Sequence, residues 1–316
     1  MTNWTWSNIA VVGAGALGSY FGGLLARAGN RVTLIGRAGH VDAIRRNGLL
    51  LQSHGTDERI PVSATTDISS VRDAGLVLFC VKSLDTETAA AAMAPHLAPD
   101  AIMLSLQNGV DNPERIGLHV RNQVVPVLVY AGANIPEPGT VRHTGGGQVV
   151  IGQLKTFRAG AEPDRGLLAG IAALFAGAGV TVKVSDDIEA DLWIKLLMNC
   201  TYNAISALGR SAYGRMVATP EVNAVMREAA GEVAAVAKAR GIRLPDDIVE
   251  TAMKLADAMP QTMSSTAQDI AKGRPTEVAY LNGYVMRQGE KLGTATPVNR
   301  TLNALIELLE QSGADR

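Results

Sequence analysis

The first part of the chain alternates short, mostly apolar runs with amphipathic stretches. The continuous run at residues 75–81 is typical of a strand buried on both faces of a parallel sheet. Repeated alternation of strand and helix signals predicts an α/β fold of the Rossmann type with a parallel, doubly wound sheet. Strands are predicted at residues 9–12, 31–35, 48–52, 59–63, 75–81, 101–106, 124–131, 148–151 and 180–184, and helices at 16–28, 41–47, 84–93 and 166–177. The strands at 48–52 and 59–63 are expected to pair around His54-Gly55.

The pattern changes at residue 188. From there on, long segments with helical periodicity follow one another, and no strand is predicted. These segments are residues 188–208, 220–240, 248–258, 277–292 and 299–310. The polar sequence Ser185-Asp186-Asp187 separates the two patterns. We therefore predict an α/β domain over residues 1–186 and an all-α domain over residues 187–316.

A glycine-rich sequence, Gly13-Ala14-Gly15-Ala16-Leu17-Gly18, joins the first predicted strand to the first predicted helix. In this context G-x-G-x-x-G predicts dinucleotide binding. Gly13 permits the tight turn, Gly15 lets the backbone approach a pyrophosphate, and Gly18 lets the helix pack closely on the sheet. The alternative, a glycine-rich turn of an unrelated α/β protein, is disfavoured by the strand, helix and strand that flank the motif.

The end of the second predicted strand distinguishes between cofactors. Enzymes that use NAD usually carry Asp or Glu there, whereas an arginine accommodates the 2′-phosphate of NADP. This chain has Arg37 and no acidic residue in residues 34–40. The planar guanidinium binds phosphate through two parallel hydrogen bonds. NADP(H) is therefore the predicted cofactor, and the alternative for Arg37 is an ordinary surface arginine.

Composition excludes several classes of function. The formal net charge is −1, so no nucleic-acid or polybasic membrane surface is expected. No apolar run approaches the ~20 residues of a membrane helix, and residues 1–8 lack a signal-peptide pattern. Cys80 and Cys200 lie in apolar stretches without metal-ligand spacing. This predicts reduced core cysteines in a cytoplasmic protein. The sequence also shows no His, Asp or Glu cluster with metal-ligand spacing, so no metal is expected.

Two polar residues directly follow predicted strands of the first domain. Lys82 follows residues 75–81, and Asn108 follows residues 101–106. Both are expected at the carboxyl edge of the sheet, where ligands bind in doubly wound folds. Lys82 could place its charge near cofactor phosphate or ribose, and Asn108 could bind ribose or substrate. The alternatives are a surface lysine and an Asn-Gly turn.

The second domain contains a more specific pattern. Lys195, Asn199 and Asn203 recur every fourth residue in an otherwise apolar helix, so they form one row along its face. Buried polar groups need partners, which a polar ligand could supply. The alternative is a lysine at a solvent edge with two asparagines bonded to backbone. Pro275-Thr276-Glu277 has the composition of a helix start, which predicts Glu277 in a first turn. There Glu277 either compensates the helix dipole or holds the Lys195 ammonium.

Together these motifs resemble the ketopantoate reductase family (2-dehydropantoate 2-reductase) over nearly the whole chain. The motifs are Gly-Ala-Gly-Ala-Leu-Gly at 13–18, Val-Lys at 81–82, Gln-Asn-Gly-Val at 107–110, Lys-x-x-x-Asn-x-x-x-Asn at 195–203, and Ser-Ser-Thr-Ala-Gln-Asp…Thr-Glu…Asn-Gly at 264–283. The resemblance implies NADPH-dependent reduction of 2-dehydropantoate to pantoate, in pantothenate biosynthesis. Hydride transfer to a ketone builds negative charge on the carbonyl oxygen, which a lysine can stabilise and protonate.

The resemblance also implies a role for each matching residue. Lys195 is the implied general acid, and Glu277 positions it and bonds cofactor ribose or a substrate hydroxyl. Asn199, Asn203 and Ser265 hold the keto acid, and Asn108 touches both cofactor and substrate. The implied NADP(H)-binding residues are Gly13, Ala14, Gly15, Ala16, Leu17, Gly18, Arg37, Lys82, Asn108 and Glu277.

One departure leaves the substrate open. Well-known members have an asparagine among their substrate contacts about ten residues beyond the position of Asn203, where this chain reads Ser211-Ala212-Tyr213-Gly214. A different 2-keto acid is therefore an alternative substrate, and a non-catalytic dinucleotide sensor is an alternative of another class. A homodimer through the alanine-rich helix 222–240 is also left open, beside packing of that helix within its own domain.

Overall fold

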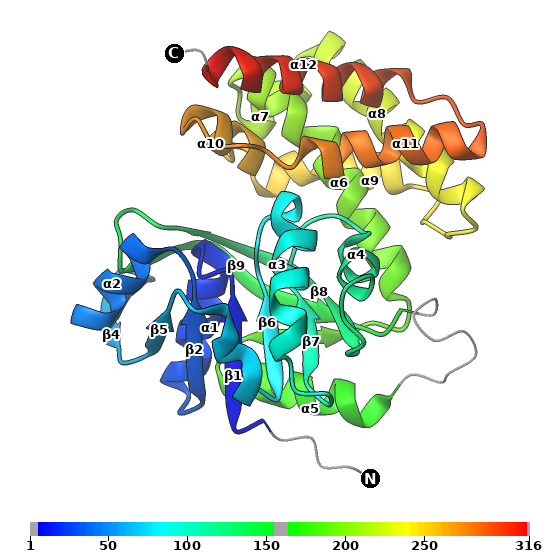
Figure 1. Cartoon of the computed structure of the whole chain (residues 1–316). Helices are drawn as coiled ribbons and strands as arrows, with labels where there is room; N and C mark the ends of the chain where they lie inside the picture. The colour runs from blue at the N-terminus through cyan, green and yellow to red at the C-terminus, as the bar shows by residue number, and fades with distance from the viewer. Residues whose placement is uncertain (1–5, 155–163, 315–316) are drawn as a thin grey trace. The chain divides into compact units, whose positions relative to one another are not determined.

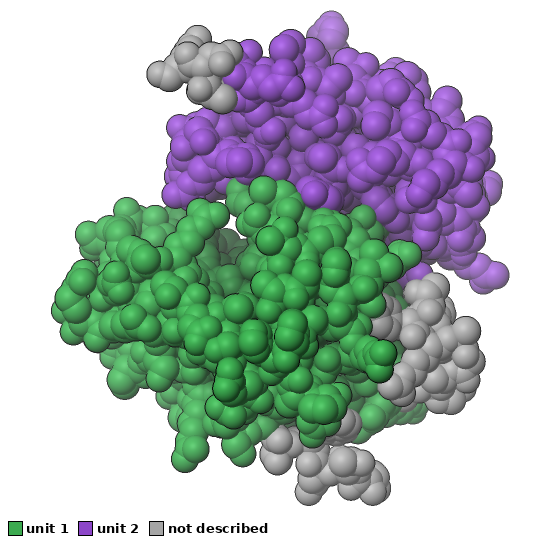
Figure 2. Space-filling model, in the orientation of Figure 1, with its two compact units in different colours: residues 1–188 green, residues 189–316 purple. Residues whose placement is uncertain are grey.

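The computed structural model of the chain describes residues 6–154 and 164–314. It divides into two compact units, Met1–Ile188 (unit 1) and Glu189–Arg316 (unit 2), which Figure 2 colours separately. Figure 1 labels the helices and strands of each unit.

Unit 1 has the predicted alternation of strands and helices. Its strands are β1 (Asn8–Val12), β2 (Arg31–Ile35), β3 (Leu49–Ser53), β4 (Thr56–Ile60), β5 (Ser63–Thr65), β6 (Leu76–Phe79), β7 (Ile102–Ser105), β8 (Val124–Asn134), β9 (Thr140–Ile151) and β10 (Thr181–Val184). Its α-helices are α1 (Ala16–Arg27), α2 (Ala38–Asn47), α3 (Thr86–Met93), α4 (Asn112–Gly117) and α5 (Arg165–Gly177), with short 3₁₀ turns η1 (Ile68–Asp73), η2 (Ser83–Asp85) and η3 (Ala94–His96).

The strands of unit 1 form one mixed sheet in the order β4-β3-β9-β8-β7-β6-β1-β2-β5, with β10 beside β9. All pairings from β8 to β5 are parallel, as predicted for a Rossmann-type domain. At the other end of the sheet β3 and β4 form the predicted hairpin around His54-Gly55, and β8 pairs with β9, which the sequence did not predict; both pairs are antiparallel. The short turn at 135–139 leads β8 straight back into β9, and a direct hairpin connection allows only antiparallel pairing.

The predicted strands at 59–63 and 148–151 differ most from those in the structure. The predicted strand at 59–63 is interrupted at Pro61, so that β4 ends at Ile60 and β5 begins at Ser63 against β2. Proline has no N–H to donate to a ladder, which explains the break. The predicted strand at 148–151 is only the end of β9, a strand of 12 residues.

Alternate residues of β1 enter two different apolar clusters, so the central strands are buried on both faces. Ile9 and Val11 pack with the apolar sides of α1 and α5. Ala10 and Val12 pack with residues of α3 and α4. Because these strands run parallel, their carboxyl ends lie together at one edge of the sheet, between covered faces.

Unit 2 is helical throughout its described residues, as predicted. Its elements are α6 (Ile188–Gly209, which begins at the last residue of unit 1), α7 (Tyr213–Ala218), α8 (Pro220–Ala239), α9 (Ile248–Ala258), α10 (Ser265–Ala271), η5 (Val278–Tyr280), α11 (Asn282–Leu292) and α12 (Pro297–Ala314). The alanine-rich helix α8 packs against α9, α11 and α12, so its small side chains serve the core of its own unit. Among residues 6–154 and 164–314, no helix is long and apolar enough to cross a membrane.

The predicted helix start at Glu277 is wrong. Glu277 precedes the short 3₁₀ turn η5, and α11 begins only at Asn282. The backbone of Leu281 (φ −111°, ψ −97°) lies outside the helical region and interrupts the helix. The buried Asn282 side chain then donates to the Cys200 carbonyl of α6 and to Asn299 Oδ1 of α12, which fixes the new start.

Candidate active site

The glycine-rich loop between β1 and α1 is held against two neighbouring strands. The N–H groups of Gly13 and Ala14 both donate to the Ile35 carbonyl at the end of β2 (3.0 and 2.9 Å). Gly13 has φ +95°, and a Cβ there would lie 2.6 Å from the Val81 nitrogen. At Gly18 a Cβ would lie 2.2 Å from the Gly13 carbonyl oxygen. Gly13 and Gly18 are therefore required by the fold itself.

Gly15 differs from the other two glycines of the motif. A Cβ at Gly15 would have its nearest neighbour, the Gly13 carbonyl oxygen, at 4.0 Å. Packing within the chain therefore does not explain the absence of a side chain. Gly15 is also the N-cap of α1, without a side-chain cap, and the first turn has no acidic residue. Bare backbone at an uncapped helix start fits the phosphates of a dinucleotide.

The four loops that carry the predicted residues of unit 1 follow adjacent parallel strands. The glycine-rich loop follows β1, Arg37 follows β2, Lys82 follows β6 and Asn108 follows β7, in the sheet order β7-β6-β1-β2. The structure thus brings them to one edge of the sheet. Arg37 is exposed, whereas Lys82 and Asn108 are partly buried.

A chain of hydrogen bonds holds the glycine-rich loop in place. It involves residues for which the sequence predicted no role. The Gly139 N–H donates to His40 Nδ1 (2.9 Å), so His40 Nε2 carries the ring proton and donates to Ser19 Oγ (3.0 Å). Ser19 Oγ donates in turn to the Ala14 carbonyl (3.3 Å). Burial lowers the pKa of His40, which favours the neutral ring that this chain requires.

Replacing His40 by glutamine is expected to make the free energy of unfolding depend less steeply on pH below neutrality. Because the folded-state pKa lies below the ordinary value of 6.5, the unfolded chain binds the proton more readily. The stability that neutral His40 contributes is therefore complete above about pH 6.5 and is lost as the pH falls towards the folded-state pKa. Melting temperatures between about pH 7 and pH 5 should fall less steeply for His40→Gln than for wild type. Parallel curves of melting temperature against pH would show that the pKa of His40 does not change on unfolding.

The row of polar residues in unit 2 lies on α6. Lys195, Asn199 and Asn203 occupy successive turns of this helix, and Lys195 and Asn199 are partly buried while Asn203 is 4% exposed. The Nδ2 group of Asn199 is buried and has no hydrogen-bond partner among the described residues. An orphaned buried donor costs about 1–3 kcal/mol, so a ligand that supplies an acceptor is favoured there.

Burial lowers the pKa of the Lys195 ammonium to about 8, and the Glu277 carboxylate opposes this shift. A donor with its pKa near neutrality is well suited to give up a proton during a reaction. Glu277 is partly buried directly before η5. Its neighbour Thr276 is anchored by donation of its N–H to Glu310 Oε1 on α12 (2.6 Å). The structure therefore places the carboxylate where it favours the charged lysine.

Ser265 lies at the start of α10 and is exposed. The serine before it, which was part of the motif but had no predicted role, holds this helix start in place. Ser264 Oγ accepts from the Ala267 N–H (3.0 Å) and donates to the Asn203 carbonyl on α6 (3.0 Å). The cap therefore ties Ser265 to the end of the Lys195 row.

The departure at residues 211–214 is a packed feature of unit 2. Tyr213 begins α7 and is 8% exposed, with its ring 4.4 Å from that of Tyr202. A Cβ at Gly214 would lie 3.0 Å from Pro260 Cβ, so the turn is tightly fitted. Where well-known members of the family resembled have an asparagine, this chain therefore has the buried ring of Tyr213.

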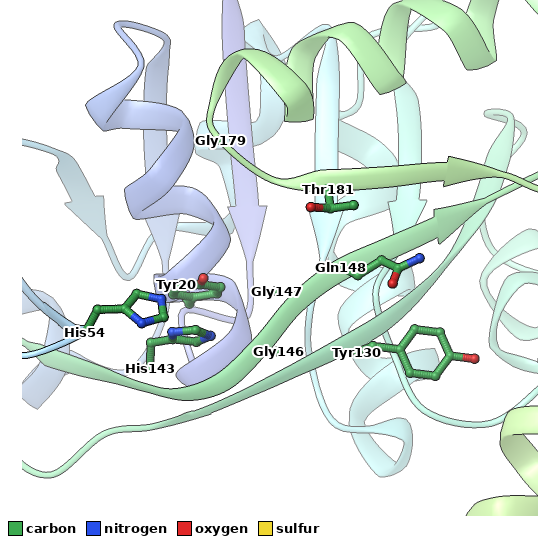
Figure 3. A pocket seen from close by; sticks show the side chains of 9 residues that line it. All are labelled: Tyr20, His54, Tyr130, His143, Gly146, Gly147, Gln148, Gly179 and Thr181. Carbon is green, nitrogen blue, oxygen red and sulfur yellow. The ribbon is translucent and has the colours of Figure 1, made fainter. Parts of the chain in front are cut away.

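A surface pocket of about 440 Å³ in unit 1 contains none of the predicted site residues (Figure 3). Its lining includes Tyr20 and His143, whose rings stack at 4.7 Å. The described residues contain no group of three or more His, Cys, Asp or Glu side chains placed to hold a metal. Cys80 and Cys200 are free thiols, and burial raises the pKa of both.

Comparison with known proteins covers both units. Residues 9–156 match the family model of ketopantoate reductase PanE/ApbA, and residues 187–310 match the model of its C-terminal part. A 2-dehydropantoate 2-reductase of Halobacterium salinarum is 37% identical over 308 residues, which are 96% of this chain and 99% of the relative.

Solved structures share the same fold. A PanE/ApbA family ketopantoate reductase of Ralstonia eutropha JMP134 is 46% identical with a TM-score of 0.90, covering 97% of this chain and 99% of that chain. A D-mandelate dehydrogenase, solved with NADH and anilino(oxo)acetate, is 26% identical with a TM-score of 0.89 at the same coverage of both chains. Both structures thus extend over the two units of this chain.

Proposed function

Because this chain belongs to the ketopantoate reductase family, we propose that it reduces 2-dehydropantoate to pantoate with NADPH. Membership makes it an oxidoreductase that acts on a CH–OH group, and the reaction belongs to pantothenate biosynthesis. The observation that carries the proposal is the buried Nδ2 donor of Asn199, one helical turn from Lys195, which has no hydrogen-bond partner in the part of the chain that the structure describes. A keto acid offers carboxylate and carbonyl oxygens as acceptors for such a donor.

The residues of unit 1 would hold the cofactor. Residues 13–18 would bind the pyrophosphate through backbone N–H groups, Arg37 the 2′-phosphate, and Lys82 and Asn108 the remaining polar groups. The bound cofactor supplies the hydride. Under this proposal residues 1–186 form the cofactor domain and residues 187–316 the substrate domain.

The residues of unit 2 would orient and protonate the substrate. Asn199, Asn203 and Ser265 would bind the keto acid through hydrogen bonds to its oxygens. The Lys195 ammonium would stabilise the negative charge that develops on the carbonyl oxygen and then deliver its proton there. Glu277 would keep the lysine charged before the transfer, since its carboxylate raises the pKa of Lys195 against the effect of burial.

A second candidate substrate is an aromatic 2-keto acid. It is favoured by the buried Tyr213 at the departure from the family pattern and by the similarity to D-mandelate dehydrogenase. Comparison of kcat/KM for ketopantoate and phenylglyoxylate separates the two. We expect the ratio to favour ketopantoate by on the order of a hundredfold, because a keto acid of the wrong shape leaves buried polar groups unpaired. A ratio that favours phenylglyoxylate would mean that the chain reduces an aromatic keto acid by the same reaction.

Replacing Arg37 by alanine tests the cofactor. The NADPH dissociation constant should rise roughly ten- to a hundredfold, as expected for the loss of charge-assisted hydrogen bonds, while that of NADH changes little. Arg31, exposed at the opposite end of β2, provides the matched control Arg31→Ala. Equal weakening of both cofactors by Arg37→Ala would mean that Arg37 does not bind the 2′-phosphate.

A further inference from the structure

Buried side chains join two of the loops at the carboxyl edge of the sheet in unit 1. The loop after β6 carries Lys82 and continues into Ser83, which is fully buried. The loop after β7 carries Asn108. Ser83 Oγ donates to the Asn108 carbonyl (3.0 Å), which connects the two loops directly.

Asn112, the first residue of α4, makes the same connection through its side-chain amide. Its Nδ2 donates to the Asn108 carbonyl (2.6 Å) and to Ser83 Oγ (3.3 Å). Its Oδ1 accepts from Thr86 Oγ1 (3.0 Å) and from Arg115 Nη1 (3.2 Å). Both donors and both acceptor sites of the amide are thus occupied, and the residue is 1% exposed.

Arg115 and Glu87 fix the surroundings of Asn112. The Arg115 guanidinium binds the Glu87 carboxylate in a bidentate manner (Nε–Oε1 2.7 Å, Nη2–Oε2 2.6 Å). The same Nη2 donates to the Ser83 carbonyl (2.6 Å). These hydrogen bonds lower the pKa of Glu87, so the pair remains charged at neutral pH. A planar guanidinium in such a bidentate pair is geometrically specific, which makes the network rigid.

We infer that Asn112 is a positioning residue that sets the distance between Lys82 and Asn108 for cofactor binding. This inference rests on the proposed function, because it takes both residues to bind the dinucleotide. The amide acts through them and does not itself contact the ligand. A buried amide that makes all four of its hydrogen bonds, as Asn112 does, has a single low-energy arrangement, so it holds the two loops at one separation. When a displacement of the loops breaks a hydrogen bond to a charged group of the ligand, binding weakens by roughly ten- to a hundredfold.

The test is Asn112→Asp, which keeps the shape of the side chain but replaces the Nδ2 donor by oxygen. The new oxygen would face the Asn108 carbonyl, which must then move away. We expect the NADPH dissociation constant, measured by calorimetry, to rise roughly ten- to a hundredfold. The matched control is Asn122→Asp. Asn122 is also buried and donates to the carbonyls of Ala98 and Ala101 (2.8 and 2.9 Å), away from both loops. At comparable losses of melting temperature, only Asn112→Asp should weaken NADPH.

Two further results decide the inference. In a Lys82→Ala background the effect of Asn112→Asp on NADPH affinity should shrink, because part of it acts through Lys82. Equal effects of Asn112→Asp and Asn122→Asp, or full additivity with Lys82→Ala, would overturn the positioning role. Failure of the wild-type chain to bind NADPH would instead refute the proposed function, so the two failures are distinguishable.

Discussion

Replacing Lys195 by alanine is expected to lower kcat by about 10²–10⁴-fold, the range over which a positioned general acid contributes. NADPH affinity should be nearly unchanged, because Lys195 belongs to unit 2 and the proposed phosphate-binding residues belong to unit 1. The substitution lowers kcat because it removes the ammonium group that would stabilise the negative charge on the substrate oxygen. Steady-state kinetics together with NADPH titration measure both quantities.

The same role predicts the pH dependence of the wild-type reaction. Only the charged lysine can donate a proton, so kcat for reduction should fall as the pH rises through about 8, the pKa to which burial lowers this group. Lys254→Ala on the exposed side of α9 is the matched control and should have wild-type kinetics. Turnover that survives in Lys195→Ala would assign the proton donor to another residue.

Adding one methyl group at Gly15 is expected to weaken NADPH binding roughly ten- to a hundredfold without unfolding the protein. The backbone at Gly15 (φ −80°, ψ −161°) accepts alanine, and the new Cβ meets no chain atom closer than 4.0 Å. It would instead occupy the space proposed for the pyrophosphate, and overpacking by one methyl group costs about 1–3 kcal/mol. Calorimetric NADPH titration and thermal melting of Gly15→Ala measure the two effects separately.

Gly18→Ala provides the contrast within the same motif. Its Cβ would lie 2.2 Å from the Gly13 carbonyl oxygen and 3.0 Å from Val11 Cγ1, so we expect a clear loss of melting temperature. Normal NADPH affinity in a folded Gly15→Ala variant would mean that the phosphates do not approach this backbone. The glycine motif would then be a feature of the fold alone.

Local patterns were sufficient to predict the elements on which the site depends. The β1, α1 and β2 segments follow from apolar runs and one glycine-rich turn, because the pattern that predicts them is contained in about thirty consecutive residues. The Lys195 row follows from helical spacing in α6. The direction of β9 could not be predicted, since the apolar pattern of a strand is the same in parallel and antiparallel pairing.

Contacts between distant segments explain what the sequence could not reveal. The start of α11 depends on hydrogen bonds from Asn282 to α6 and α12, so the helix-start composition at Pro275 was misleading. Asn112 donates to Ser83, and His40 accepts from the Gly139 N–H; both partners lie far away along the chain. Neither residue has a periodic or motif signal, and only the folded arrangement identifies their partners.

The most direct test is the rate at which the purified chain consumes NADPH after ketopantoate is added, with pantoate quantified at the end. The proposed function predicts rapid consumption and one pantoate formed for each NADPH oxidised. NADPH binding without consumption, with ketopantoate recovered unchanged, would contradict it. Consumption with phenylglyoxylate instead would assign another keto acid as substrate, and no consumption with either would favour a non-catalytic dinucleotide sensor.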